Sequence, residues 1–396
     1  MKKIIVILSL IFVPAAMADS FYSSMGMGLP MVYPSAKSMG MGGAGIAVLD
    51  PMILNGMNPA AIATQGYTMF SLDFQFESTE IKNDDNKVTA RDGNAVGFRM
   101  AFPVKRNINV AVGLKPHLGS KYELATTGQV GTQSEYTRTL DGHGGLNAAT
   151  IGVQYVLSSK LALAALTNFY FGSYYEEYNT DFASSFYKDG ADELISHTRG
   201  IGFELGALYR FNEQLFVGAI FKSSSTLNTE TKVSLGQFYS SEPKDQDMVY
   251  PLGLGVGGSF RVQKVTLAMD LYTQLWSNYK LDGNTTDELN DYIRLGGGLE
   301  YVDTGDMYAS YFRRIIYRIG ATYTQLPFQS DTGGAINEQY LSFGLGFPFQ
   351  ANNGRIDIAL EVGYRGNLDD AAYRENIARV SCSISGSELW FQRPKR

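Results

Sequence analysis

Apolar and polar residues alternate with a period of two in many segments between residues 67 and 391. A period of two places successive side chains on opposite faces of a β-strand. The alternation predicts strands of about ten residues, enough to cross a bilayer at a tilt. The clearest apolar series are Phe98, Met100 and Phe102; Val265, Leu267, Met269 and Leu271; Leu341, Phe343 and Leu345; and Ile358, Leu360 and Val362.

The lengths of the connections distinguish a membrane barrel from a soluble β-sandwich, because both alternate in the same way. Short connections near residues 105–107, 158–160, 212–214, 263 and 352–354 take turns with long polar stretches at 82–92, 122–139, 176–198, 232–248 and 278–288. Bacterial barrels have short turns at one rim and long loops at the other. The segments number fourteen, so the expected fold is all-β, a transmembrane antiparallel β-barrel of 14 strands.

Composition supports this prediction. Charged residues are 18% of the chain, below the roughly 25% of soluble domains, whereas Gly (43), Tyr (25) and Phe (23) are abundant. No later segment has the roughly 18 consecutive apolar residues of a membrane-spanning helix. A net charge of −6 argues against nucleic acid as a partner. Five aromatic residues near expected strand ends are candidates for interfacial girdles: Phe102, Phe211, Trp276, Tyr301 and Trp390.

The N-terminus has the pattern of a cleavable export signal. Lys2 and Lys3 precede an apolar run at residues 4–13, and Ala16 and Ala18 supply the small residues that signal peptidase reads. We therefore expect residues 1–18 to be a signal peptide and the mature chain to be exported to the outer membrane of a Gram-negative bacterium. Cys382 is the single cysteine of the sequence, so an internal disulfide framework is excluded.

Residues 19–65 differ from the rest of the chain. Glycine and proline interrupt this segment, and its three charged residues are too few to keep a disordered tail solvated. A fourteen-stranded barrel is too wide for its wall side chains to fill. We therefore expect a hatch of residues 19–65 inside the lumen, a barrel of residues 66–391 and a tail of residues 392–396. Its methionines are flexible enough to line a pocket for apolar ligands or to pack the plug: Met25, Met27, Met31, Met39, Met41, Met52 and Met57.

Motifs at both ends of the mature chain resemble the FadL family of outer-membrane long-chain fatty-acid and hydrocarbon transporters. The first is the run AKSMGMGGA at residues 36–44, followed by the hatch signature Asn58-Pro59-Ala60; the second comprises residues 317–327 and 342–346. The resemblance implies a plugged barrel that carries hydrophobic molecules. The basic tail after Phe391 departs from the family, whose members commonly end on an aromatic residue.

The resemblance also implies a kink in the third strand, which opens the wall toward the membrane. Proline cannot donate a hydrogen bond to a neighbouring strand, so Pro116 marks a bulge or the end of the strand that begins near Ile108. By analogy with the family, Asn58 and Ala60 of the hatch would line the gap. The residues assigned to the kink are Lys115, Pro116, His117, Leu118 and Gly119.

Other chemical motifs have weaker support. Residues 40–45 match the dinucleotide fingerprint GxGxxG, but no strand and helix flank them; their glycines more simply allow a tight fold. His117, His143 and His197 lack the spacing of metal ligands. A barrel lipase would need a serine activated by His143. We therefore expect no enzyme activity, no cofactor and no metal.

Two functions remain open. The first is passive transport of hydrophobic small molecules, with partners that comprise the ligand, outer-membrane lipid and the barrel-assembly machinery, and with the protein a monomer. In relatives, two long loops form an outer capture groove, where Lys188 or Lys244 would attract a carboxylate here. The second is a structural or secretion-associated barrel without transport. The groove residues implied by the resemblance are Phe182, Phe186, Tyr187, Leu235, Phe238 and Tyr239.

Overall fold

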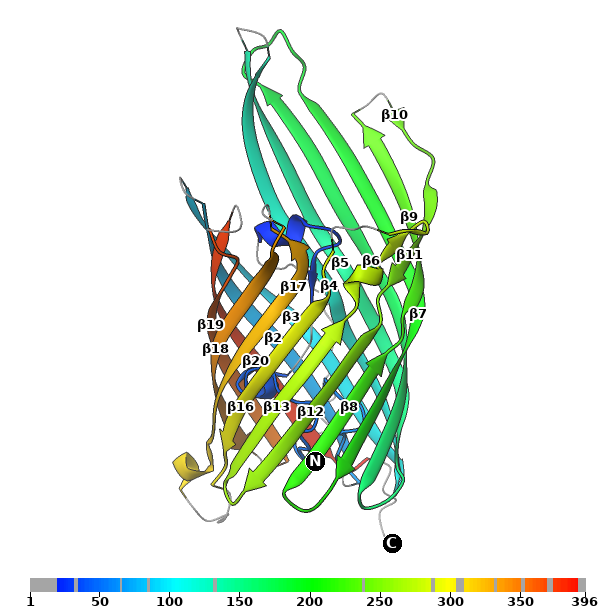
Figure 1. Cartoon of the computed structure of the whole chain (residues 1–396), viewed down its shortest axis with the longest axis vertical. Coiled ribbons are helices and arrows are strands. Elements are labelled where there is room, and N and C mark those ends of the chain that lie inside the picture. The colour runs from blue at the N-terminus through cyan, green and yellow to red at the C-terminus, as the bar shows by residue number, and fades with distance from the viewer. Residues whose placement is uncertain are drawn as a thin grey trace, which may run out of the picture.

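The protein is a barrel of antiparallel strands that encloses its own N-terminal segment (Figure 1). The structure, a computed structural model, describes residues 20–31, 35–64, 66–83, 86–130, 134–236, 239–285, 289–303, 310–330, 333–349, 353–368 and 373–390. The predicted signal peptide and C-terminal tail lie outside these residues. No helix within the described ranges is long and apolar enough to cross a membrane.

The wall is made of long strands that pair mainly with their neighbours in sequence, and it closes where the first pairs with the last, Thr68 opposite Glu388. These strands are β2 (Thr68–Lys82), β3 (Lys87–Lys105), β4 (Ile108–Val130), β5 (Ser134–Val156), β6 (Leu161–Phe182), β7 (Gly190–Arg210), β8 (Leu215–Lys222), β9 (Ser225–Leu235), β11 (Lys244–Tyr250), β12 (Gly253–Val262), β13 (Val265–Gln274), β16 (Tyr292–Tyr301), β17 (Ile316–Gln329), β18 (Ala335–Phe349), β19 (Gly354–Arg365) and β20 (Arg374–Glu388).

Two of the wall strands are interrupted. β8 and β9 both pair with β7, and two serines separate them. β11 and β12 continue the next strand in the same way on either side of Pro251 and Leu252. With each pair counted as one, the described wall has 14 antiparallel strands, which confirms the prediction.

The remaining elements are short. Four are two-residue strands: β1 (Leu29–Pro30), β10 (Tyr239–Ser240), β14 (Lys280–Leu281) and β15 (Asn284–Thr285). The others are α1 (Ala36–Met39) and the 3-10 helices η1 (Phe21–Ser24), η2 (Trp276–Asn278) and η3 (Tyr311–Arg314).

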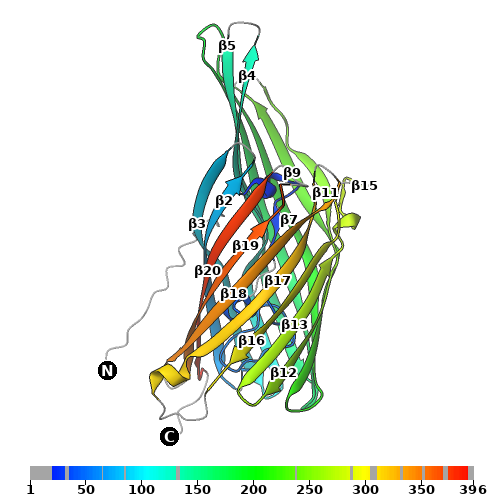
Figure 2. The same ribbon diagram turned by 60° about the vertical axis from the view of Figure 1, so that its left-hand side comes forward.

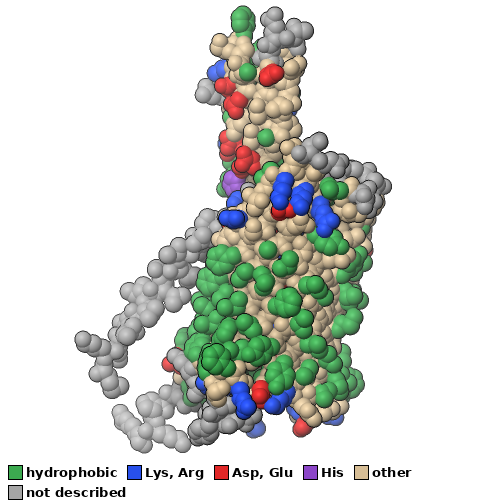
Figure 3. Space-filling view, turned by 90° about the vertical axis from the view of Figure 1, so that its left-hand side faces the viewer, with side chains coloured by type: hydrophobic (Ala, Val, Ile, Leu, Met, Phe, Trp, Pro, Cys, Tyr) green, Lys and Arg blue, Asp and Glu red, His purple; other side chains and the backbone are tan. Residues whose placement is uncertain are grey.

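The predicted alternation separates a lipid-facing surface from the lumen. On β13, Leu267, Met269 and Leu271 point outward and are about half exposed, whereas Thr266 and Asp270 point inward and are buried. The same arrangement along the other strands gives a belt of apolar side chains around the wall, with charged side chains gathered above and below it (Figure 3). Such a belt is the surface that a bilayer requires.

Most of the predicted long loops are strands. β4, β5, β6 and β7 rise well above the neighbouring strands (Figure 1), and β4 pairs with β5 as far as Val130 and Ser134. We call their upper part, residues 121–130, 134–143, 175–182 and 190–197, the projecting sheet. The loop prediction was wrong here because both faces of this sheet meet water, so its sequence lacks the apolar alternation of a membrane strand.

The N-terminal segment lies inside the barrel, with η1 near the rim that carries the projecting sheet (Figures 1 and 2). Lumen-facing polar groups hold its backbone from several sides. Asp270 of β13 accepts bonds from the N–H groups of Gly45 and Ile46, and Ser383 of β20 accepts one from Ala36. The described residues 20–31 and 35–64 therefore lie in the lumen.

One predicted girdle residue is misplaced. Trp276 is buried, because the chain leaves β13 after Gln274 and turns through η2 toward the lumen. Phe211, Tyr301 and Trp390 are exposed, and Trp390 contacts Phe102. These four remain candidates for the membrane interface.

Candidate functional site

The wall loses one of its pairings next to the predicted kink. β3 and β4 pair as far as Phe98 opposite Leu114, although β4 continues to Val130 and pairs with β5 almost throughout. The β4–β5 register shifts between Pro116 and Leu118. The bulge interpretation of Pro116 is therefore correct, and the alternative that the strand ends there is wrong. Above Leu114, β4 is separated from β3.

The hatch takes the place of β3 beside this part of β4. Leu29 and Pro30 of β1 pair antiparallel with Gly119 and Leu118. The N–H of Met31 donates to the carbonyl of His117 at 2.8 Å. Further along, the N–H of Ser20 donates to the carbonyl of Lys121 at 3.0 Å. The hatch thus satisfies backbone groups of β4 that β3 leaves unpaired, as a barrel wall in lipid requires.

Asn58 and Ala60 do not line this gap. The side chain of Asn58 donates to the carbonyls of Ile46 and of Ala207 on β7, and the carbonyl of Ala60 accepts a bond from Gln154 on β5. The hatch signature therefore anchors the segment to the wall on the lumen side. The hatch residues at the kink are Leu29, Pro30 and Met31, and the sequence-based placement was wrong.

A small cavity adjoins the kink inside the barrel. Lys115, Pro116 and His117 form one side of it, and its volume is about 10 Å³, room for about one water molecule. The other lining residues come from the hatch and from β8 and β13: Met31, Gly56, Met57, Ile220, Lys222 and Tyr272.

The charges at this cavity leave an excess of one positive charge. Lys115 is paired with Glu204 of β7 at 2.6 Å, whereas the ammonium of Lys222 lies 5.1 Å from the centre of the Tyr272 ring. His117 is buried; its Nδ1 is 3.3 Å from the Tyr250 hydroxyl, and its Nε2 has no hydrogen-bond partner within the described structure. Polar groups at the cavity are therefore available to an anionic ligand.

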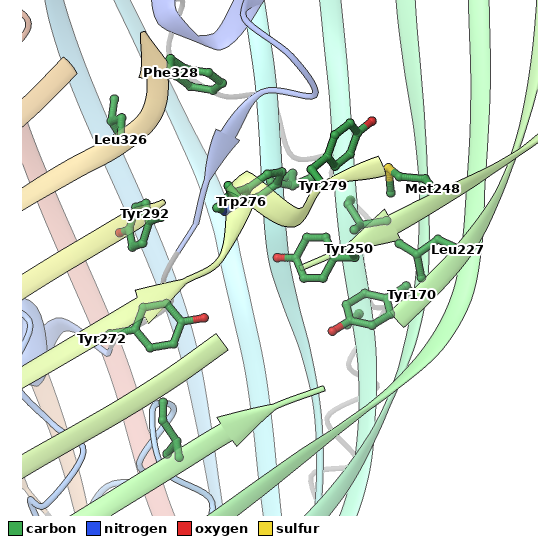
Figure 4. Packing of buried hydrophobic residues seen from close by; sticks show 14 of the residues in the cluster. Tyr170, Leu227, Met248, Tyr250, Tyr272, Trp276, Tyr279, Tyr292, Leu326 and Phe328 are labelled. Atoms are coloured by element: carbon green, nitrogen blue, oxygen red, sulfur yellow. The ribbon is translucent and has the colours of Figure 1, made fainter. Parts of the chain in front are cut away.

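Aromatic side chains continue from the cavity toward the rim (Figure 4). Tyr170 contacts His117 with ring centres 5.0 Å apart, and Tyr250 lies between Tyr170 and Trp276. These residues belong to one buried cluster, against which Met25, Met27 and Leu29 of the hatch pack. The cluster gives the lumen an apolar lining next to the cavity.

Six of the seven hatch methionines divide into two groups. Met39 packs with Ala359 of β19, and Met41 packs with Ala268 of β13, so these two fix the hatch to the wall. Met25, Met27, Met31 and Met57 lie at the cavity or the aromatic cluster. Met52 is partly buried and belongs to neither set.

The glycine-rich run lies against the wall. Gly42 has a φ of +65°, and a Cβ atom at this position would meet the Ala321 carbonyl at 2.3 Å. Ser342 of β18 accepts a bond from the Gly42 N–H, and Thr322 of β17 donates one to its carbonyl. The conformational interpretation of these glycines is confirmed.

Six buried charges join the hatch to the wall in a closed ring. Lys37 contacts Asp50 at 2.5 Å and Glu300 at 3.3 Å. Arg318 bridges Glu300 and Asp357, and Arg355 bridges Asp357 and Asp50, at 2.6–2.8 Å. Burial alone would raise the pKa of Asp50, but Arg355 and Lys37 hold that pKa well below its ordinary value. Positive and negative charges alternate around this ring and balance.

The predicted outer capture residues lie on two separate tips (Figure 1). Phe182 stacks on Tyr187 and contacts Tyr136 at the top of the projecting sheet, where Phe186 is almost fully exposed. Leu235 pairs with Tyr239 on the shorter tip. Phe238 lies outside the described residues. β9 pairs with β7 as far as Leu235 opposite Asp192, so the backbone joins the two tips at their base, whereas none of the described ring contacts joins the two groups of side chains.

Within the described part of the chain, no group of three or more His, Cys, Asp or Glu residues is placed to hold a metal ion. His143 stacks on Tyr175 and contacts Asp141. A lipase based on His143 would need a serine hydrogen-bonded to it. Ser173, on the neighbouring strand, bonds His197 instead.

Sequence reasoning missed the wall residues of the site. Glu204, Lys222 and Tyr272 lie on β7, β8 and β13, and a polar side chain at a lumen-facing position of an otherwise apolar strand is the available signal. That signal does not say which strands face one another across the lumen.

Comparison with known proteins gives a family and a fold. A family model described as BamG matches residues 1–396, and no curated protein matches the sequence. A FadL homologue of Pseudomonas aeruginosa has a TM-score of 0.65 and 13% identity over 92% of this chain and 100% of its own.

Two toluene transporters have similar structures. For TbuX of Ralstonia pickettii the TM-score is 0.59 at 16% identity, over 89% of this chain and 97% of that one. For TodX of P. putida the TM-score is 0.57 at 15% identity, over 93% of this chain and 99% of that one. At these identities the likeness shows the fold alone, and it confirms the FadL-like barrel expected from the N-terminal motif.

Proposed function

The chain belongs to the BamG family, and from its FadL-like fold we propose that it is an outer-membrane protein that passes hydrophobic small molecules from its lumen sideways into the bilayer. The separation of β3 from β4 above Leu114 carries this proposal. A hydrophobic solute that leaves through the wall would enter the lipid without crossing water. Two proteins of similar structure are toluene transporters, which supports the same class of cargo.

The cavity charges favour an amphipathic acid over a neutral hydrocarbon. Lys222 has no carboxylate partner among the described residues, and it lies beside the Lys115–Glu204 pair. A carboxylate in this place would balance the charge and accept a hydrogen bond from the Nε2–H of His117, which has no partner within the described structure. The apolar chain of the ligand would lie along Tyr272 and Met57. A long-chain fatty acid has both features.

Transport requires the hatch to move. The cavity holds about 10 Å³, far less than a ligand pocket of several hundred cubic ångströms. Met31 and Met57 line the cavity, and methionine changes rotamer easily. Displacement of β1 from β4 would enlarge the cavity and open the wall in one step, since Met31 follows β1 directly.

Substitution of Gly119 tests the lateral route. Gly119 pairs with Leu29 at the gap, so Gly119→Phe places a bulky ring in the exit. Gly258→Phe is the matched control, because open space surrounds Gly258 on the lipid-facing surface. We expect uptake of radiolabelled oleate by cells to fall severalfold in the first variant and to stay unchanged in the second. Equal uptake by both, with the barrels assembled, would show that the lateral route is wrong.

A structural or secretion-associated role is the second candidate. The small volume of the cavity and the height of the projecting sheet favour it, since neither is needed for passive release of a ligand. Lipid extraction separates the two functions. Reproducible stoichiometric fatty acid in protein purified under mild detergent supports transport; its reproducible absence, together with wild-type uptake in cells lacking the protein, supports the structural role.

A further inference from the structure

The upper part of β4 has a free edge. β3 stops pairing with β4 at Leu114, β1 covers Leu118 and Gly119, and Ser20 bonds the Lys121 carbonyl. Beyond Lys121, none of the described strands pairs with this edge. Edge groups alternate along a strand, so every second residue presents its N–H and C=O on the side of the Lys121 carbonyl. These residues are Glu123, Ala125, Thr127 and Gln129.

The edge lacks the usual protection against strand addition. Proteins cover their edge strands or break them with prolines, bulges and charges. Residues 122–130 contain no proline and one charge, Glu123, and their pairing with β5 is regular. At about 3.4 Å per residue the open edge is roughly 30 Å long. It is long enough to bind an added strand.

A row of carboxylates begins at this edge. Glu123 lies opposite Asp141, Asp141 opposite Glu177, and Glu177 opposite Glu193, on four successive strands. All four side chains are exposed on the face of the projecting sheet that points away from the lumen. Like charges on directly opposed residues destabilise a sheet. Acidic side chains gather on this column above the apolar belt (Figure 3).

We propose that the free edge of β4 binds an extended, basic segment of a partner protein as an additional antiparallel strand. The same edge already binds β1 in this way, so strand addition continues an existing interface. The residue that comes to lie opposite Glu123 extends the acidic row to a fifth strand, where lysine or arginine is favoured. A second copy of this chain would bring its own acidic row to the same place.

Binding of a defined peptide tests the proposal. The probe is a fluorescent peptide of about ten residues in which lysine alternates with threonine and valine, added to the full protein in non-ionic detergent. The control peptides carry glutamate for lysine, or N-methyl groups on alternate amides that block edge pairing. We expect the lysine peptide to bind at least about tenfold more tightly than either, and to protect the Ala125 and Thr127 amides from hydrogen exchange.

Two protein variants separate the edge from the charge. Thr127→Pro removes an edge N–H while leaving the β5 pairing intact, and it should weaken binding about tenfold. Asp141→Asn with Glu177→Gln should weaken binding at low salt and reduce its salt dependence. Glu213→Gln, an exposed carboxylate at the opposite rim, should have no effect. Heat-modifiable gel migration checks that each barrel is folded.

Three results would overturn the proposal. Lysine and glutamate peptides of equal affinity would remove the charge argument, and unchanged binding by Thr127→Pro would remove the edge. A wild-type dimer that Thr127→Pro converts to monomer would identify the occupant as a second copy of the chain.

Discussion

Pro30 of the hatch pairs with Leu118 of β4 at the place where β3 no longer pairs with β4. The hatch is therefore part of the wall at this point as well as a filling of the lumen. A change that loosens β1 should act on the lateral gap and on the cavity together.

The first prediction concerns Gly28, directly before β1. Its φ is +92°, and a Cβ atom would meet the Gly119 carbonyl at 2.4 Å. Gly28→Ala should displace β1, and the Met31 amide, which bonds His117, should lose its protection from hydrogen exchange. Gly66→Ala is the matched control, because Gly66 has a φ of +89° and open surroundings. Both variants carry about 1–2 kcal/mol of backbone strain. Equal Met31 protection in both would contradict the argument.

The second prediction concerns the charge ring. Lys37→Met leaves Asp50 and Glu300 with one fewer buried cation, and removal of one partner from a buried pair costs about 3–5 kcal/mol. The hatch should become accessible to protease at a much lower denaturant concentration. Lys264→Met, which breaks the exposed pair with Asp303, should change nothing. Equal protease resistance of the two variants would exclude the ring as the anchor.

The third prediction is a pH dependence. Because the pKa of Asp50 is lowered when the hatch is docked, its contribution to docking is complete above the ordinary value of 3.8 and declines as the pH falls from there toward the lowered pKa. Limited proteolysis by pepsin between pH 5 and pH 2 should show hatch release at the acidic end. In the Asp50→Asn variant, the hatch should be released at a higher pH, and its release should depend less steeply on pH. If hatch release depends equally steeply on pH in both proteins, Asp50 is not the source of the pH dependence.

The fourth prediction separates acids from neutral ligands. Lys222→Met should weaken binding of a fatty acid by about tenfold, the loss of one charge-assisted contact, and leave binding of an alkane unchanged. Lys264→Met is the control, since Lys264 is exposed, pairs with Asp303 and does not line the cavity. Isothermal titration of the detergent-solubilised protein measures both. Equal losses for acid and alkane would mean that Lys222 shapes the pocket rather than binding a carboxylate.

The wall strands were predictable because lipid on one side and a polar lumen on the other impose the alternation seen at Leu267, Asp270 and Met269. For the same reason, the projecting sheet could not be predicted from the alternation of polar and apolar residues. Asn179 and Thr180 meet water on both faces of β6, so the pattern that identifies a membrane strand ends while the strand continues.

Pro116 shows how much of the site a sequence specifies. Its missing N–H locates a departure from regular pairing, and the register shift lies there. That Met31 rather than Asn58 lies beside His117 depends on how the hatch crosses the lumen. Contacts between segments so far apart in sequence leave no local signal in either one.

The charge ring also constrains the order of assembly. Lys37 and Asp50 leave the ribosome early, whereas Glu300, Arg318, Arg355 and Asp357 belong to β16, β17 and β19. The ring thus cannot be completed before some of the last strands are made, and Ser20 bonds Glu375 on β20, the strand that closes the wall against β2. Docking of the hatch is therefore completed late, when the oldest part of the nascent chain meets the youngest.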